Sequence, residues 1–136
     1  MPKSKKQEHL TPDIVYDKIE ELWGYKKEDM YDPCPPGVPF RSACFFNGLY
    51  GDYQRLNYVN CPFEQKILEK FVIKSHQQQL KGNVTVMLLP TKTDQLWFQT
   101  YIIPRISNDI YWFDKRIKFK NDKWAATDTH FLARFK

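Results

Sequence analysis

Four consecutive residues, Asn60-Cys61-Pro62-Phe63, carry the groups in this chain that are best suited to chemistry. The carboxamide oxygen of Asn60 can accept a hydrogen bond from an NH2 group, and the backbone carbonyl of Cys61 can accept that group's second hydrogen. Pro62 favours an extended backbone at Cys61, which helps to aim that carbonyl, and Phe63 offers a ring for stacking on a base. The segment can therefore hold a planar amine. The alternative is that Asn-x-Pro only ends a strand in a turn.

The segments on either side of this tetrapeptide predict where it lies in the fold. An apolar run, Leu56-Asn57-Tyr58-Val59, precedes it and reads as a strand. Residues 64–81 follow without an internal Gly or Pro, and their apolar side chains form one stripe, which predicts an amphipathic helix ending at Gly82. A strand followed by a helix puts the tetrapeptide at a carboxyl strand end, where α/β proteins form ligand crevices.

Two further helices are predicted from start and stop signals. Thr11 can cap a helix and Pro12 suits its first position, and apolar residues recur at helical spacing up to Gly24. Residues 94–103 predict a second helix, which ends before Pro104.

The remaining elements indicate an α/β sheet. Residues 84–89 are almost continuously apolar and stop at Pro90, which is typical of a central strand buried on both faces. Further β-rich runs are found at residues 110–113, 116–119 and 129–135. Because helices and strands alternate early and strands cluster late, we expect an open, mostly parallel sheet with an antiparallel C-terminal strand or hairpin.

Several motifs match one enzyme family in chain order. They are Leu10-Thr11-Pro12-Asp13, Tyr31-Asp32-Pro33-Cys34, Phe45-Phe46-Asn47-Gly48-Leu49, Asn60-Cys61-Pro62-Phe63, Leu89-Pro90 and Asp114-Lys115-Arg116-Ile117-Lys118-Phe119. Together they resemble the phage-type DNA N6-adenine methyltransferases, the small Dam-like family, whose corresponding catalytic motif is Asn-Pro-Pro-Tyr/Phe. The resemblance runs from about residue 10 to the end of the sequence.

This resemblance implies a single-domain, Rossmann-like fold over residues 10–136 that uses S-adenosylmethionine. It implies transfer of a methyl group to the N6 amine of an adenine in DNA, with the base flipped out of the duplex and held in line. The implied catalytic residues are Asn60, Cys61, Pro62 and Phe63. The implied cofactor-binding residues are Thr11, Pro12, Asp32, Pro33, Cys34 and Asn47.

Two features depart from the family pattern. Cys61 stands where the family has proline, so the carbonyl remains while backbone rigidity falls. The chain is also compressed between Leu49 and Asn60, which leaves little material for a separate DNA-reading module. The enzyme would then recognise its target DNA sequence with little specificity, or a partner protein or a second copy of the chain would supply that recognition.

Alternatives from other classes remain open. The first is a catalytically weak or inactive methyltransferase fold that serves as a nucleic-acid-binding or structural subunit. Another is methylation of RNA or of a protein glutamine, because the same two acceptors suit any planar amine or amide. A nucleophilic role for Cys61 is disfavoured, since neither a base nor an electropositive cradle adjoins it in the sequence.

The composition and net charge of the chain indicate which class of partner it binds. The chain has 136 residues, of which 42% are hydrophobic, and a formal net charge of +5. The apolar content excludes disorder for the body of the chain, and the positive charge favours polyanions such as DNA. Residues 1–9 are expected to form a basic, flexible tail.

Cysteine and hydropathy patterns suggest a compartment. Three cysteines without a CxxC pair and three widely separated histidines predict neither a metal site nor a disulfide framework. No long apolar window or signal-peptide pattern is found, so we expect no membrane partner. The expectation is a cytoplasmic protein, in a host cell if the source is a phage or other virus, as the family resemblance suggests.

Overall fold

A computed structural model describes residues 10–34 and 49–136. Its centre is a four-stranded sheet with the order β1-β2-β4-β3. The strands are β1 (Leu56–Val59), β2 (Val84–Pro90), β3 (Ile110–Trp112) and β4 (His130–Phe135). β1 and β2 are parallel, while β4 runs antiparallel to both β2 and β3. The carboxyl ends of β1, β2 and β3 therefore share one side of the sheet, which we call the carboxyl edge.

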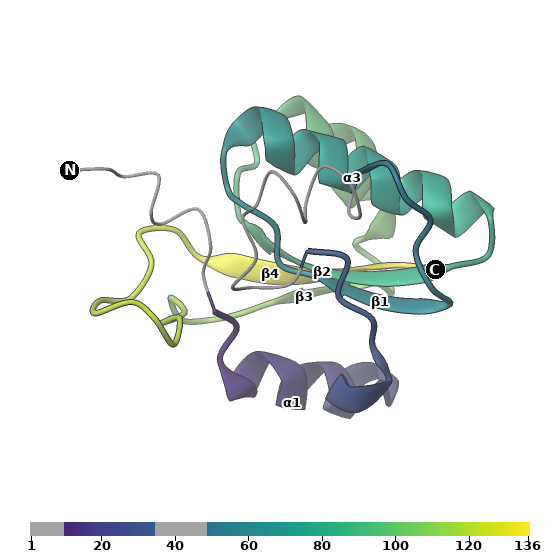
Figure 1. Ribbon diagram of the computed structural model, residues 1–136. Helices are drawn as coiled ribbons and strands as arrows, with labels where there is room; N and C mark the ends of the chain where they lie inside the picture. Colours follow the sequence, from purple (N-terminus) through teal and green to yellow (C-terminus); the bar gives the residue numbers. More distant parts are fainter. Residues whose placement is uncertain (1–9, 35–48) are drawn as a thin grey trace.

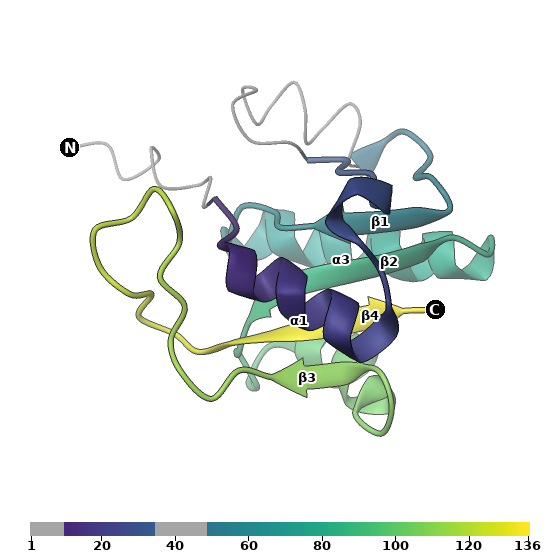
Figure 2. The same ribbon diagram turned by 90° about the horizontal axis from the view of Figure 1, so that it is seen from below.

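Helices cover both faces of this sheet (Figures 1 and 2). α1 (Asp13–Trp23) lies on one face, and α3 (Gln65–Leu80) lies on the other. The helical turns η4 (Phe98–Ile102) and η5 (Ile103–Arg105) lie on the same face as α3, and η2 (Lys27–Asp29) follows α1. After η2 the chain turns back, and Tyr31 forms an isolated parallel bridge with Asn57. This bridge delivers residues 32–34 to the carboxyl edge beside the end of β1.

β2 separates two hydrophobic cores. Val86 and Leu88 belong to the core under α1, whereas Met87 and Leu89 belong to the core under α3. Successive side chains of a strand point to opposite faces, so a strand that is apolar at every position is buried on both sides. The prediction of a central, doubly buried strand is confirmed.

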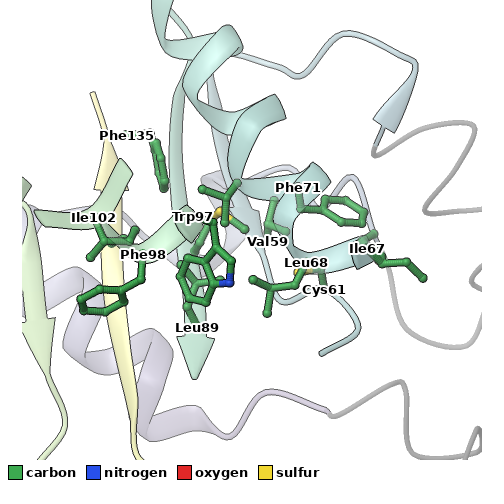
Figure 3. Close-up of a cluster of buried hydrophobic side chains, with 14 of the residues drawn as sticks. Val59, Cys61, Ile67, Leu68, Phe71, Leu89, Trp97, Phe98, Ile102 and Phe135 are labelled. Atoms are coloured by element: carbon green, nitrogen blue, oxygen red, sulfur yellow. The ribbon is translucent and has the colours of Figure 1, made fainter. Parts of the chain in front are cut away.

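The core under α3 is the larger of the two and reaches the tetrapeptide (Figure 3). Phe71 and Leu68 of α3 meet Cys61, while Trp97 covers the cluster beside them. Burial of this apolar stripe, at roughly 25 cal/mol per Å² of apolar surface, holds α3 against the sheet. The start of α3 is fixed in this way, and with it the segment between β1 and α3.

The sheet is mixed rather than mostly parallel, so that part of the predicted fold class was wrong. Among the described strands, β1–β2 is the parallel ladder and the other two ladders are antiparallel. The antiparallel C-terminal strand itself is confirmed. Because β4 inserts between β2 and β3 instead of lying at the sheet edge, it converts two ladders to antiparallel pairing. The α/β class stands.

Two predicted elements differ in detail. Residues 116–119 form no strand, although Ile117 and Phe119 are buried. The run instead lies in a loop, where Lys120 donates its backbone N–H to Leu10 and Ala126 donates to Ile117. The helix predicted to end before Pro104 becomes π and 3₁₀ turns that continue through it. Pro104 is tolerated because the first positions of a helical turn need no N–H donor.

None of the helices in residues 10–34 and 49–136 is long and apolar enough to cross a bilayer. The predicted flexible tail, residues 1–9, lies outside the described residues.

Candidate functional site

The tetrapeptide lies where the sequence predicts it. Asn60 directly follows β1, and one residue, Glu64, separates Phe63 from α3, so the four residues cross the carboxyl edge of the sheet. Parallel strand ends next to a helix start are the usual place for a ligand crevice in α/β proteins.

A short chain of hydrogen bonds links Asn60 to the start of the described chain. The Nδ2 group of Asn60 donates to Oγ1 of Thr11 at 2.9 Å, and Thr11 Oγ1 is 2.9 Å from the Tyr58 hydroxyl. With its NH2 group turned toward Thr11, the carboxamide presents its oxygen on the opposite side. That oxygen, Oδ1, lies below the surface. A substrate amine can therefore reach it only when a neighbouring group moves aside.

Thr11 does not cap α1 as predicted. Pro12 occupies the N-cap position, and no side chain makes a capping hydrogen bond there. The hydroxyl of Thr11 is instead used by Tyr58 and Asn60. Pro12 thus fixes the entry of the helix, while Thr11 is free to position the carboxamide.

A pocket of about 380 Å³ opens beside this network. Its walls come from the start of α1, the segment around η2, β1 and the loop between β3 and β4. The lining residues are Leu10, Thr11, Tyr16, Lys27, Met30, Asp32, Tyr58 and Lys120. The volume lies within the usual range for small-molecule sites, roughly 300 to 1,000 Å³. The pocket combines rings, a carboxylate and two ammonium groups.

Asp32 is the acidic group of this pocket. Its Oδ1 accepts a hydrogen bond of 2.8 Å from the backbone N–H of Cys34, which holds the side chain in a tight turn. Burial raises the pKa of Asp32 to about 6, and the Cys34 hydrogen bond only partly offsets that rise. The carboxylate is therefore charged above pH 6 and is costly to desolvate. Perturbed carboxylates in pockets are candidates for function.

Cys61 is a core residue. Its side chain is 1% exposed and lies in the core under α3. Burial raises the pKa of this thiol to about 12, so the thiolate is scarce at neutral pH.

Cys34 is disulfide-bonded, although the cysteine pattern predicted no disulfide framework. Cys61 is a free cysteine. The bond removes one of the reasons for expecting a reducing compartment.

Phe63 packs between the two cores. Its ring centroid is 5.2 Å from that of His130 and 6.0 Å from that of Phe119. It also borders a small pocket of about 180 Å³ with Pro90 and Trp97. Phe63 thus keeps one partly exposed side at the carboxyl edge. No local pattern indicates that His130 is its neighbour, because the two are brought together by the central position of β4.

The structure brings Thr11, Asp32 and Asn60 to one place, but not all the predicted cofactor residues. Pro33 and Cys34 are buried and do not line the pocket. Asn47 lies outside the described residues. The pocket also contains groups that the sequence did not single out: Tyr16, Lys27, Tyr58 and Lys120. Within the described ranges, no cluster of three or more potential metal ligands occurs.

Comparison of the chain with family models, curated proteins and solved structures gave no match. Functional assignment therefore depends on the residues and geometry described above.

The role of Cys61 can be tested by replacement with proline. Under the methyl transfer that the family resemblance implies, Cys61→Pro should keep or raise activity, because only the backbone carbonyl is needed and proline stiffens it. Cys61→Ala keeps the backbone and removes the buried thiol, so it should cost about 1 kcal/mol of stability and little activity. Labelled-methyl transfer and thermal unfolding measure the two effects. A large loss of activity in both variants would show that the thiol has a chemical role.

Proposed function

We propose that this protein transfers a methyl group from S-adenosylmethionine to the N6 amine of adenine in DNA. The observation that carries the proposal is the meeting of three separate motifs at one edge of the sheet. Asn60 of the Asn-Cys-Pro-Phe motif donates a hydrogen bond to Thr11 of the Thr-Pro motif, and Thr11 lines the same pocket as Asp32. These residues are far apart in sequence, so a strand-ending turn alone gives no reason for them to converge.

The pocket suits the proposed cofactor in its polar groups. The Asp32 carboxylate would accept hydrogen bonds from ribose hydroxyls. The ammonium groups of Lys27 and Lys120 would attract the carboxylate of the methionine part. When bound, S-adenosylmethionine supplies an electrophilic methyl group.

Asn60 and Cys61 would then hold the substrate. The carboxamide oxygen of Asn60 and the carbonyl of Cys61 accept the two hydrogens of an NH2 group, which directs the nitrogen lone pair toward the reacting carbon. Thr11 keeps the carboxamide in the orientation that presents its oxygen. Positioning is the main contribution in this scheme, and such alignment can supply a large part of a rate enhancement. Phe63 offers its exposed side to the base.

A second candidate is a weakly active or inactive fold of the same kind that binds nucleic acid as a subunit. The specific observation in its favour is the buried Oδ1 of Asn60. A protein of this kind need not bind S-adenosylmethionine at all.

The proposal is tested by incubating the purified full chain with radiolabelled S-adenosylmethionine and, in parallel, duplex DNA, RNA and a protein fraction. We expect label in DNA, recovered as N6-methyldeoxyadenosine after nuclease digestion and mass spectrometry. Label in RNA or in protein glutamine would replace the substrate assignment. Absence of label in all three, from folded protein, would favour the inactive-subunit candidate.

A further inference from the structure

The loop between β3 and β4, residues 113–129, projects from the carboxyl edge of the sheet (Figures 1 and 2). Between residues 114 and 124 there are five basic and two acidic residues, which gives this stretch a charge of +3 out of the chain's +5. Lys120 pairs with Asp13 at 3.0 Å. Lys115, Arg116 and Lys118 are exposed and form no ion pair with any residue of the described ranges.

The inner side of this loop is fixed to the site. Ile117 and Phe119 are buried in the core under α1, and the Phe119 ring contacts Phe63. The backbone N–H of Leu10 donates to Oδ1 of Asn121 at 2.9 Å, and Lys120 lines the 380 Å³ pocket. The loop that carries the basic side chains is therefore held against Phe63 and the rim of the pocket.

An exposed indole completes the surface. Trp124 is 74% exposed, and the ammonium of Lys123 lies 5.3 Å from its ring centroid. Cations beside an aromatic ring form the combination that binds a nucleic-acid strand, because cations neutralise phosphates and the ring stacks on a base.

We propose that the outer side of this loop, formed by Lys115, Arg116, Lys118, Lys123 and Trp124, is the surface that docks DNA beside Asn60. This inference deepens the proposed function by naming the contact that brings the strand to the site, and it rests on that function for the choice of DNA. The short segment between residues 49 and 60 leaves little material for binding DNA, and in this proposal the loop supplies part of that binding surface.

Binding is measured by fluorescence anisotropy of a labelled DNA duplex with the full chain, without cofactor, over a range of salt concentrations. We expect Lys115→Gln/Lys118→Gln to weaken binding and to reduce the slope of log affinity against log salt by about two. Trp124→Ala should weaken binding about tenfold, and Trp124→Phe should restore most of that loss because a stacking ring remains.

Matched controls lie at the opposite end of the sheet. Lys26→Gln/Lys136→Gln removes the same charge, and Leu80→Ala shortens a side chain that is 75% exposed. Both should bind like the wild type. Three results would each overturn the inference. They are loop variants that bind DNA as tightly as the wild type, a wild type that does not bind duplex DNA at low salt, and a clear preference of the wild type for RNA. This assay measures DNA binding and not methyl transfer. Its result can therefore be interpreted even if the protein proves not to be a methyltransferase.

Discussion

Replacement of Asn60 by alanine should lower the rate of methyl transfer at least about a hundredfold, the scale on which enzymes lose rate when one preorganised hydrogen-bonding group is removed. The substitution deletes one of the two acceptors that hold the amine. It also ends the contact with Thr11, although the Thr11–Tyr58 hydrogen bond remains. The fold should survive, since loss of one part-buried hydrogen bond costs about 1 kcal/mol. Single-turnover methyl transfer with labelled cofactor measures the effect.

A matched control for this variant is Asn83→Ala. The side chain of Asn83 also makes a hydrogen bond, to Oε1 of Gln78 at 2.8 Å, but it lies just before β2 at the other end of the sheet. Its loss should cost similar stability and no activity. Cofactor binding by Asn60→Ala should stay close to wild type. If this variant transfers methyl groups at the normal rate, the catalytic role of the tetrapeptide is wrong.

Asp32→Asn should affect cofactor binding and stability in opposite directions. Above pH 6 the wild-type carboxylate is charged and is the stronger acceptor, so the variant should bind S-adenosylmethionine about tenfold more weakly at pH 8. As the pH falls through about 6, wild-type affinity should drop toward that of the variant, because Asp32 takes up a proton. The affinity of Asp32→Asn should change little over the same range. Calorimetric titrations at several pH values measure this.

The stability effect follows from the same raised pKa. Between about pH 4 and pH 6 the folded state holds a proton on Asp32 that the unfolded chain has lost, so the contribution of Asp32 to stability falls as the pH rises through that window. Above pH 6 the full cost of the buried charge persists, and Asp32→Asn should unfold at a higher temperature there. Asp17→Asn, an exposed change on α1, should alter neither property. A variant of Asp32 with unchanged cofactor affinity at every pH would remove this residue from the site.

Local patterns in the sequence were enough to predict α3, β2 and the position of the tetrapeptide. The helical spacing of Leu68, Phe71 and their apolar neighbours predicts α3. The continuous apolar run of β2 predicts a strand that is buried on both faces. The place of β4 between β2 and β3 depends on long-range pairing that no local pattern encodes. This is why the sheet was predicted as mostly parallel.

The positions of Asn60 and Asp32 at the carboxyl edge were predictable, because each directly follows an extended segment within one motif. The groups from other elements were not. Thr11 has the type and place of a helix cap, yet its hydroxyl is used across the chain by Tyr58. Lys120 reaches the pocket only because its loop is tied to Leu10 by a backbone hydrogen bond. Such contacts are products of the packed fold and leave no signature in spacing.

The most direct test of the central claim is calorimetric titration of the full chain with S-adenosylmethionine and, separately, with S-adenosylhomocysteine. A working methyltransferase should bind both, with Kd values of about 100 μM or tighter, equivalent to at least roughly 5.5 kcal/mol. Weaker binding by Asp32→Asn in the same experiment would locate the ligand in the pocket described here. Absence of detectable heat with either ligand, from protein shown to be folded, would contradict the proposed function.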